Sequence, residues 1–228
     1  MTAPLLFIAA DPRECIDWIA HWDDVRPVAL PVHWARAGKW RGRDVIAIAN
    51  GAGPERARAA VAANAVSAVC NIGFCGALDS AFQPGDVFIA NEIRNGARTY
   101  TARRPAGPPT RSGPLASIDH VARTAREKRG LRATGALVVE MEAAGAARGA
   151  EELGVPFYCV RAISDLAGED LHNDFNSALR PDGRFSVPRL IAGALASPWQ
   201  RFRELIILKQ RTEIASKNLG DFLANCTF

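Results

Sequence analysis

Short apolar runs rich in β-branched residues alternate along this chain with alanine-rich runs of helical period. This alternation constrains the chain to an α/β fold, because each strand and helix must bury its apolar face against a neighbour. We expect a three-layer α/β/α sandwich with a mixed central sheet. With 228 residues, 48% of them hydrophobic, the chain is long enough to form a single domain over 1–228.

The expected strands and helices follow from local composition. Pro54 after the glycine turn 51–53 predicts a helix start, and Gly154 followed by Pro156 predicts a helix end. The stretch 94–113, rich in Pro, Gly and Arg, is expected to be an irregular surface loop. Strands are expected at 4–10, 32–37, 44–50, 68–72, 86–93, 136–140 and 157–163. Helices are expected at 14–22, 55–66, 117–128, 142–153, 187–195 and 198–224.

Composition argues against several classes of protein. The five cysteines form no CxxC pair and the four histidines show no metal-ligand spacing, so we expect no disulfide, no metal and no other cofactor. The formal net charge is +4, but the arginines are scattered along the chain, which argues against a nucleic-acid surface. The N-terminus lacks the basic start of a signal peptide, so we expect a cytoplasmic protein.

Motifs of two other enzyme classes are incomplete or absent. Gly51-Ala-Gly53 begins like a dinucleotide-binding fingerprint, yet Arg56 stands where the third glycine belongs. The sequence has no Gly-x-Ser-x-Gly, the motif that carries a serine nucleophile in many α/β enzymes. Neither nicotinamide redox chemistry nor a serine hydrolase is therefore expected.

Carboxylates follow two of the expected buried strands at the point where each strand ends. Glu140 and Glu142 follow the apolar run that begins at 136, and Asp165 follows the run that begins at 157. In α/β folds the active site lies at the carboxyl ends of the strands. Each carboxylate alone would also suit the N-terminus of a helix, where a negative charge is favourable. The pair predicts a shared site built from Glu142 and Asp165.

The residues around these strand ends resemble a known family. The motif Glu140-Met-Glu142-Ala, followed by Arg161-Ala-Ile-Ser-Asp165, is similar to the signature of methylthioadenosine/S-adenosylhomocysteine nucleosidases. The motif Gly73-Phe-Cys-Gly76 with Pro-Gly-Asp-Val at 84–87 resembles the second signature of these enzymes. Matching segments run from about residue 5 to about residue 170. The resemblance implies the purine nucleoside phosphorylase/nucleosidase superfamily.

The resemblance implies a reaction and a role for each matched residue. The family cleaves the N-glycosidic bond through an oxocarbenium-like sugar, and Asp165 matches the acid that protonates N7 of the leaving base. An aspartic acid needs burial or a neighbouring carboxylate to hold a proton near neutral pH. Glu142 matches the residue that binds the ribose hydroxyls, and Met141 matches the residue packed under the sugar. Further expected site residues are Glu140, Gly53, Phe74, Cys75, Gly76, Ser164 as the residue that orients the acid, and Arg161 as the cation that offsets the acidic cluster.

The loop after the first expected strand bears on whether water or phosphate attacks the sugar. Glu14 matches the family glutamate that activates water. Arg13 resembles the phosphate-binding arginine of the phosphorylases, although it comes one residue early. We expect hydrolysis with Glu14 as the base. Phosphorolysis through Arg13 or Arg56 is the alternative, and an ordinary first-turn helix glutamate is the plain interpretation of Glu14.

The base-binding segment departs from the family pattern. The family stacks an aromatic residue on the base, but this chain has Ser117-Ile-Asp-His120-Val there, so we expect His120 or Phe74 to compensate. An exposed helix residue is the plain interpretation of His120. Segments 115–128 and 173–184 resemble the branch associated with hopanoid biosynthesis, which implies adenosylhopane as substrate and ribosylhopane as product. Methylthioadenosine, S-adenosylhomocysteine and futalosine stay open as alternative substrates.

The C-terminal stretch 198–224 and the resemblance together set the expected partners. Aromatic and aliphatic residues alternate there with Arg and Lys, as in a helix that lies on a membrane surface or one that packs its apolar stripe on the sheet or on a second subunit. The resemblance implies a homodimer that binds a small nucleoside, and a lipid-linked nucleoside would bring it to the inner membrane. A nucleoside-binding scaffold without activity is the non-enzymatic alternative.

Overall fold

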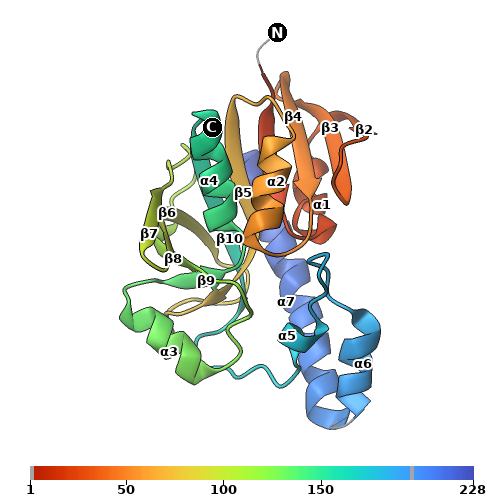
Figure 1. Cartoon of the computed structure of the whole chain (residues 1–228), viewed down its shortest axis with the longest axis vertical. Helices are drawn as coiled ribbons and strands as arrows, with labels where there is room; N and C mark the ends of the chain where they lie inside the picture. Colours follow the sequence, from red (N-terminus) through yellow and green to blue (C-terminus); the bar gives the residue numbers. More distant parts are fainter. Residues whose placement is uncertain (1–2, 196–197) are drawn as a thin grey trace.

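The central element of the computed structural model, which describes residues 3–195 and 198–228, is one mixed sheet. Its strands follow the order β10-β6-β8-β9-β5-β1-β4-β3-β2, with β7 paired to β6 (Figure 1). Strand β1 is parallel to β4 and β5, whereas β3 is antiparallel to β4. The strands are β1 Leu5–Ala9, β2 Asp23–Pro27, β3 Trp34–Trp40, β4 Arg43–Ala49, β5 Ala68–Ala77, β6 Val87–Asn95, β7 Arg98–Thr101, β8 Arg111–Ser117, β9 Val138–Glu140 and β10 Phe157–Asp165.

Part of the sheet closes on itself. Strand β10 is parallel to β5 on one side and antiparallel to β6 on the other, so β5, β9, β8, β6 and β10 form a ring. Gly76 of β5 pairs with both Val139 of β9 and Asp165 of β10. The closure therefore brings together the ends of the two strands that carry the acidic motifs.

Helices cover both faces of the sheet, which confirms the predicted three layers. Helices α2 and α4 pack against each other and on one face, and α1 and α7 pack on the other (Figure 1). The first face buries alanines of α2 and α4, and the second buries an aromatic cluster around Trp18. The helices are η1 Pro12–Glu14, α1 Ile16–Ile19, α2 Pro54–Ala62, α3 Ala125–Ala133, α4 Ala143–Leu153, α5 Phe175–Ala178, α6 Val187–Leu195 and α7 Pro198–Ala224.

Local chemistry explains where α2 and α4 begin and end. Pro54 is the first residue of α2, where its missing N–H costs no helical hydrogen bond. Gly154 ends α4 in the left-handed conformation that glycine adopts without strain. Gly145 lets the two helices approach, since a Cβ at this position would lie 1.8 Å from the carbonyl oxygen of Pro54.

Two sequence predictions in the middle of the chain are wrong. The stretch 94–113 is not an irregular loop, because β6 and β7 form a hairpin there and β8 begins at Arg111. The predicted helix 117–128 is also wrong, since Ser117 ends β8 and helix α3 begins only at Ala125. Ladder hydrogen bonds to neighbouring strands hold these Arg- and Pro-rich segments extended, and local composition does not report such partners.

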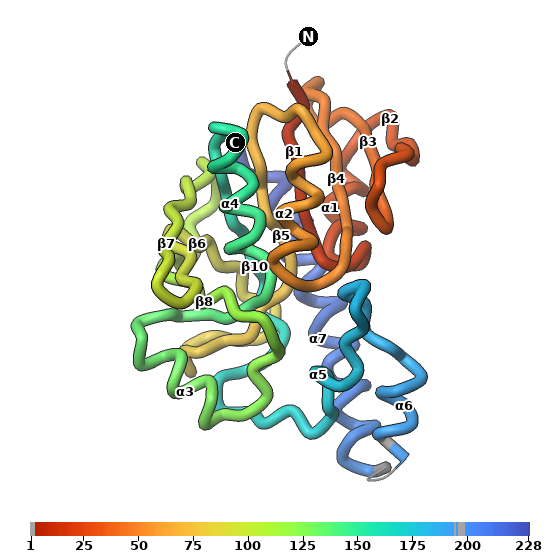
Figure 2. Tube along the Cα trace, in the orientation of Figure 1, coloured from red at the N-terminus to blue at the C-terminus, as the bar shows by residue number. Residues whose placement is uncertain are grey.

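The helices α6 and α7 extend beyond the sheet, as the tube view shows at the lower right (Figure 2). The last turns of α7 bury Ala215, Leu219 and Leu223 against the sheet, whereas its first half carries the exposed Trp199 and Ile206. The C-terminal end of α7 therefore packs in the hydrophobic core, whereas apolar side chains in its first half are exposed. Among the described residues, no helix is both long and apolar enough to span a bilayer.

Candidate active site

Glu14 lies at the end of the short helix that follows β1, and its carboxylate is buried. Its Oε2 accepts hydrogen bonds from the backbone N–H groups of Ala10 (2.8 Å) and Asp11 (3.0 Å). Its Oε1 accepts from the N–H of Phe74 on β5 at 2.9 Å. Three backbone donors from two segments therefore fix both oxygens of Glu14 beside β5.

Gly73 of β5 separates Glu14 from Arg161 and has to be a glycine. A Cβ at this position would lie 2.7 Å from Oε1 of Glu14 and 2.6 Å from Nη1 of Arg161. Its φ of 150° also lies where side chains are rarely found. The glycine motif at 73–76 thus makes room for charged groups from two other elements.

Arg161 of β10 is fully buried and forms ion pairs with two carboxylates, Glu140 and Glu142. Its Nη2 donates to Glu140 Oε2 and to Asn71 Oδ1, and its Nη1 donates to the carbonyl of Ile72 at 3.1 Å. Glu142 Oε2 lies 3.8 Å from Nη1. Arg161 therefore lies in direct contact with the acidic cluster, where the sequence prediction puts a cation.

Glu140 and Glu142 differ in what they bind. Both oxygens of Glu140 accept from the N–H of Ala143, and Oε2 also accepts from the N–H of Glu142, so Glu140 caps the start of α4. Among the described residues, Glu142 has fewer partners, since its Oε1 accepts one long hydrogen bond of 3.4 Å, from the N–H of Gly53 at the start of α2. Glu142 is therefore the carboxylate with capacity left for hydroxyl groups of a ligand.

Burial controls the charges in this cluster. It raises the pKa of Glu14 above its usual value, although the hydrogen bond from Phe74 and the charge of Arg161 oppose the shift. Burial, with the nearby charge of Glu140, raises the pKa of Glu142 well above its usual value. Burial alone would lower the pKa of Arg161, but the surrounding carboxylates outweigh it and raise that pKa. The guanidinium thus stays charged, while two of the carboxyl groups near it ionise less readily than in water.

Asp165, the predicted acid, lies at the end of β10 opposite Gly76. Ser164 Oγ donates to its Oδ1 at 3.0 Å, so the serine contacts the predicted acid directly. Lys128 Nζ donates to its Oδ2 at 2.5 Å and to the carbonyl of Leu166 at 2.8 Å. A Cβ at Gly76 would lie 2.8 Å from Oδ2, so this glycine leaves the space that the carboxylate occupies.

The predicted residues thus meet along one segment of β5. Gly73 contacts Glu14 and Arg161, and Gly76 faces Asp165 three residues later, a separation of roughly 10 Å along a strand. Glu142 joins the cluster through Arg161. Among the remaining predicted residues, Gly53 donates to Glu142, the carbonyl of Cys75 accepts from Ser164 at 3.2 Å, and Met141 is buried.

Three residues singled out in the sequence lie apart from this cluster. His120 is exposed in the loop after β8, where it contacts Asp119 (2.8 Å) and Glu127 (2.6 Å). The ring of Phe74 packs against the aromatic core on the α1 and α7 face, so only its backbone reaches Glu14. Arg13 is exposed and pairs with Asp11 at 2.8 Å.

Lys128 lies beside the predicted acid although no sequence motif identifies it, and Ser117, which the sequence places in the base-binding segment, contacts helix α4. Lysine in a polar helix is normally exposed, yet the Lys128 side chain has no accessible surface. Ser117 Oγ accepts from the N–H of Ala144 in the first turn of α4. Only the packing of α3 and β8 beside β10 and α4 brings these polar groups to the site.

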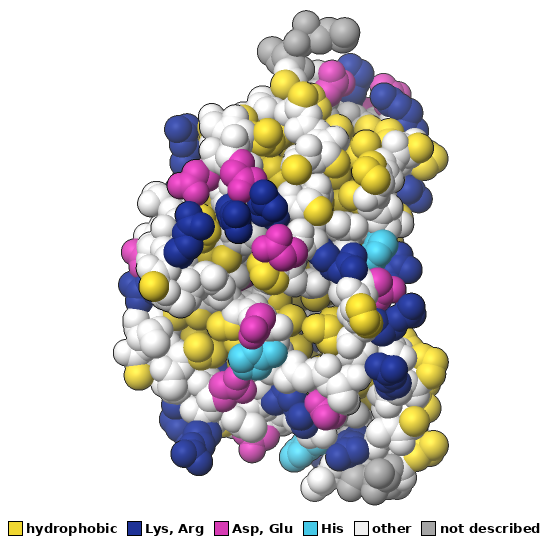
Figure 3. Space-filling view, in the orientation of Figure 1, with side chains coloured by type: hydrophobic (Ala, Val, Ile, Leu, Met, Phe, Trp, Pro, Cys, Tyr) yellow, Lys and Arg dark blue, Asp and Glu magenta, His cyan; other side chains and the backbone are white. Residues whose placement is uncertain are grey.

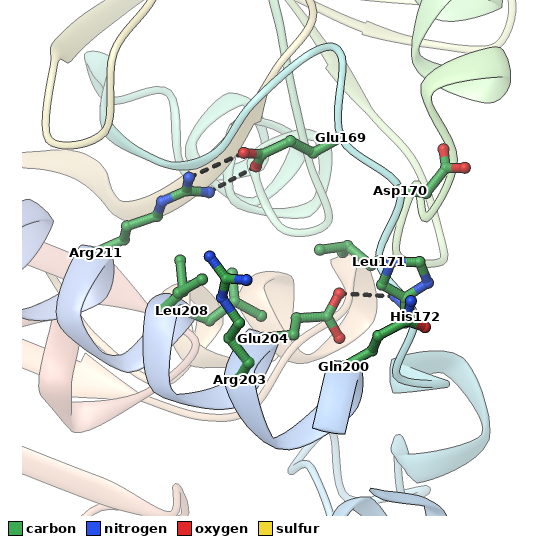
Figure 4. A pocket seen from close by; sticks show the side chains of 10 residues that line it. Glu169, Asp170, Leu171, His172, Gln200, Arg203, Glu204, Leu208 and Arg211 are labelled. Carbon is green, nitrogen blue, oxygen red and sulfur yellow. Dashed lines mark hydrogen bonds and ion pairs between the residues drawn. The ribbon is translucent and has the colours of Figure 1, made fainter. Parts of the chain in front are cut away.

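A groove of about 340 Å³ lies between the loop after β10 and helix α7 (Figure 4). The charged groups that line it are largely paired: Glu169 binds Arg211 at 2.6 and 2.9 Å, and Glu204 accepts from the N–H groups of His172 and Asn173. These contacts hold the loop on α7. None of the predicted site residues lines the groove, so we assign it no part in the chemistry.

Clusters of metal-ligating side chains are absent from the described part of the chain. Within residues 3–195 and 198–228, no three or more His, Cys, Asp or Glu side chains are arranged to hold a metal ion.

Comparison with known proteins adds to this geometry. The family model described as "Phosphorylase superfamily" matches residues 4–107 and 92–182.

Three solved structures are similar in fold at low sequence identity. A 5′-methylthioadenosine/S-adenosylhomocysteine nucleosidase from Neisseria meningitidis, in complex with methylthio-immucillin-A, is 19% identical with a TM-score of 0.74, and the match covers 97% of each chain. A mutant of the Helicobacter pylori enzyme with 5′-methylthioadenosine in its active site is 16% identical, with a TM-score of 0.75 over 98% of this chain and 97% of that one. A futalosine hydrolase mutant from Helicobacter pylori is 15% identical, with a TM-score of 0.74 over 97% of each chain.

Proposed function

The chain belongs to the phosphorylase superfamily, and we propose that it hydrolyses the N-glycosidic bond of an adenosine derivative and releases adenine. The family and the enzyme class predicted from the sequence are confirmed by this membership. One observation carries the choice of reaction: a buried carboxylate, Glu14, and a second carboxylate, Asp165, flank the same four-residue segment of β5.

The proposed reaction divides the work between these groups. Glu14 accepts a proton from water, which attacks the anomeric carbon as the sugar becomes cationic. Glu142 accepts hydrogen bonds from the ribose hydroxyls, and these bonds strengthen as positive charge develops on the ring. Met141 packs under the sugar. Asp165 supplies the proton with which the base leaves as a neutral purine.

Phosphorolysis is the second candidate, and the environment of Glu14 argues against it. A phosphate anion would have to lie beside the buried Glu14 carboxylate, where like charges repel strongly. Arg13 binds Asp11, and Arg56 donates to the carbonyl of Pro181 at 2.6 Å. Both arginines proposed as phosphate ligands therefore already have partners in the protein.

For the substrate we propose a nucleoside with an apolar 5′ chain, adenosylhopane being the candidate that the sequence resemblance implies. The exposed apolar side chains of α6 and α7 support this choice, because a membrane-borne substrate requires an enzyme that reaches the bilayer surface. The proteins of similar fold include methylthioadenosine/S-adenosylhomocysteine nucleosidases and a futalosine hydrolase, which keeps these nucleosides as the alternatives. A homodimer in the cytoplasm, associated with the inner membrane, is the proposed state.

Chromatographic detection of free adenine from a panel of nucleosides tests the proposal. Adenosylhopane, 5′-methylthioadenosine, S-adenosylhomocysteine and futalosine are compared with and without inorganic phosphate, and futalosine is followed by its own base. We expect release that does not depend on phosphate. Release only with phosphate would establish phosphorolysis instead.

Two variants test the assigned roles. Glu14→Gln and Asp165→Asn are each expected to lower kcat by about 10²–10⁴-fold, the usual contribution of a general base or acid. Glu55→Gln, an exposed first-turn helix glutamate, is the control and should retain wild-type activity. A nucleoside-binding scaffold would bind the panel without turnover and would be indifferent to both changes.

A further inference from the structure

Lys128 is a buried cation that the proposed reaction has not used. Its side chain, on helix α3, has no accessible surface. Its Nζ donates to Asp165 Oδ2 and to the carbonyl oxygen of Leu166, the residue that follows the acid. Burying an ammonium is costly unless it is paired and hydrogen-bonded, so this position is built for a cation in contact with Asp165.

The acid step consumes a proton at Asp165 in every turnover, and that proton has to be replaced from a neighbouring group. Lys128 Nζ donates directly to Oδ2 of this carboxylate. The other donor to the carboxylate is the hydroxyl of Ser164, which is far too weak an acid to supply one. In the contacts of Asp165 within the described residues, the ammonium is the group that carries a transferable proton.

We propose that Lys128 is the proton reservoir for base departure and passes its proton to the base through Asp165. The inference rests on the proposed function and adds a residue to it. Lys128 would touch Asp165 and not the substrate, so it acts through the acid as a positioning and proton-supplying residue.

Protons and electron pairs balance over the proposed reaction. A proton moves from Nζ of Lys128 to the Asp165 carboxylate, which leaves a neutral amine and a carboxylic acid. The carboxylic acid gives its proton to a ring nitrogen of the purine while the electron pair of the N-glycosidic bond moves onto the base. Water adds to the sugar cation and loses a proton to Glu14. After product release, Glu14 returns its proton to solvent and Lys128 takes one up, so the enzyme is restored.

The surroundings suit this exchange. Bonds from both Ser164 and Lys128 hold the two oxygens of Asp165, so the carboxylate cannot turn away from the ammonium. The carbonyl of Leu166 holds Nζ in place as it changes charge. Helix α3 is itself anchored, since Thr124 accepts at its N-terminus from the N–H of Glu127 at 3.1 Å.

A comparison of leaving groups tests the proposal. The base of 5′-methylthioadenosine needs a proton to leave, whereas 4-nitrophenolate leaves 4-nitrophenyl β-D-ribofuranoside without one at neutral pH. We expect Lys128→Met to lose about 100-fold or more of kcat on 5′-methylthioadenosine, the lower part of the usual range for acid catalysis. The same variant should stay within about threefold of wild type on the nitrophenyl riboside, because the water-activating groups are intact.

Lys128→Arg separates proton supply from charge. Arginine keeps the cation and a donor to Asp165 but does not deprotonate in proteins. It should therefore lose activity on 5′-methylthioadenosine as Lys128→Met does, and it keeps the test decisive if the methionine variant does not fold. Lys39→Met, an exposed lysine on β3, is the matched control and should behave as wild type on both substrates.

Each other outcome overturns a specific claim. Equal losses on both substrates in folded variants would make Lys128 a structural residue and overturn the inference alone. Full activity of Lys128→Arg on 5′-methylthioadenosine would show that charge suffices and would overturn proton supply. If the wild type does not cleave 5′-methylthioadenosine, the adenine nucleoside of the panel that it does cleave takes its place in this comparison. Wild-type protein that releases no base from any nucleoside of the panel would overturn the proposed function, and this inference with it.

Discussion

At the scale of single residues, one buried guanidinium makes the acidic site possible. Glu14, Glu140 and Glu142 are all buried, and Arg161 is the cation among them. A buried charge without a partner is far more costly than a buried pair, so the three carboxylates depend on this one side chain. The carboxylates that a nucleosidase needs are thus supported by a residue that itself has no accessible surface.

Removing that guanidinium should destabilise the whole protein. Arg161→Met leaves Glu140 and Glu142 without their cation, and we expect the free energy of unfolding to fall by about 3–5 kcal/mol. Urea denaturation measures the change. The exposed Arg58, which pairs with Glu152 at 3.0 Å, gives the matched control, and Arg58→Met should stay close to wild type. Equal effects of the two substitutions would contradict the role given to burial.

The raised pKa of Glu14 should appear in the pH dependence of the reaction. A general base works only when ionised, and burial raises the pKa of Glu14 above the ordinary glutamate value. The value of kcat/KM should therefore fall as the pH is lowered through a pKa above about 4.5. Glu14→Gln should lack this limb, whereas Glu142→Gln should retain it. A wild-type limb centred at or below the ordinary value would contradict the assignment.

At the scale of secondary-structure elements, two helices begin at the site and are held together by a glycine. The N-terminal residues of α2 and α4 meet where Gly53 donates to Glu142. Their first turns approach so closely at Gly145 that a methyl group has no space beside Pro54. The position of Glu142 therefore depends on the fit between the two helices.

Adding one methyl group should test that fit. Gly145→Ala places a Cβ against the backbone of Pro54, and we expect a loss of stability of about 1–3 kcal/mol or more, with a lower kcat because Glu142 moves. Gly130→Ala is the matched control. Gly130 is exposed in α3, and no atom lies within 4 Å of the place that a Cβ would take, so alanine should stabilise the protein by about 0.5–1 kcal/mol. Thermal unfolding and adenine release measure both effects.

At the scale of the whole molecule, charge and exposed apolar surface coincide. The segment 187–211 holds five basic side chains and one acidic side chain, so it carries the whole formal net charge of +4. Among its described residues, four large apolar side chains are more than half exposed: Val187, Leu195, Trp199 and Ile206. The space-filling view shows hydrophobic side chains beside Lys and Arg at the lower right, over α6 (Figure 3). A basic surface with exposed apolar side chains is complementary to an anionic lipid surface.

Vesicle sedimentation should reveal this surface. We expect the protein to bind vesicles of equal parts phosphatidylglycerol and phosphatidylcholine, to bind pure phosphatidylcholine weakly, and to be released by salt. The double variant Ile191→Ser/Trp199→Ser should lose binding, whereas Val25→Ser/Leu153→Ser, also exposed, should keep it. A dimer in light scattering that only the first variant disrupts would assign the surface to a second copy of the chain instead.

The fold class and the family follow from the order of the amino acids alone. Alternating strand and helix patterns and the motifs at 73–76, 140–143 and 161–165 are local, so they can be recognised without knowing what each residue contacts. The strands that carry these motifs follow from the apolar runs before them. The spacing of the motifs predicts the pair Glu142 and Asp165, and the family resemblance that the motifs carry implies Glu14 as well.

Which charged side chains form ion pairs, and which can exchange a proton, depends instead on how the chain packs. Lys128 and Asp165 are 37 positions apart, and Arg161 reaches Glu140 across 21, so no local pattern pairs them. The strands at 98–101 and 111–117 likewise owe their conformation to hydrogen bonds with other strands. Electrostatic energy and ladder hydrogen bonds depend on distance in space, and distance in space is set only when the whole chain has packed.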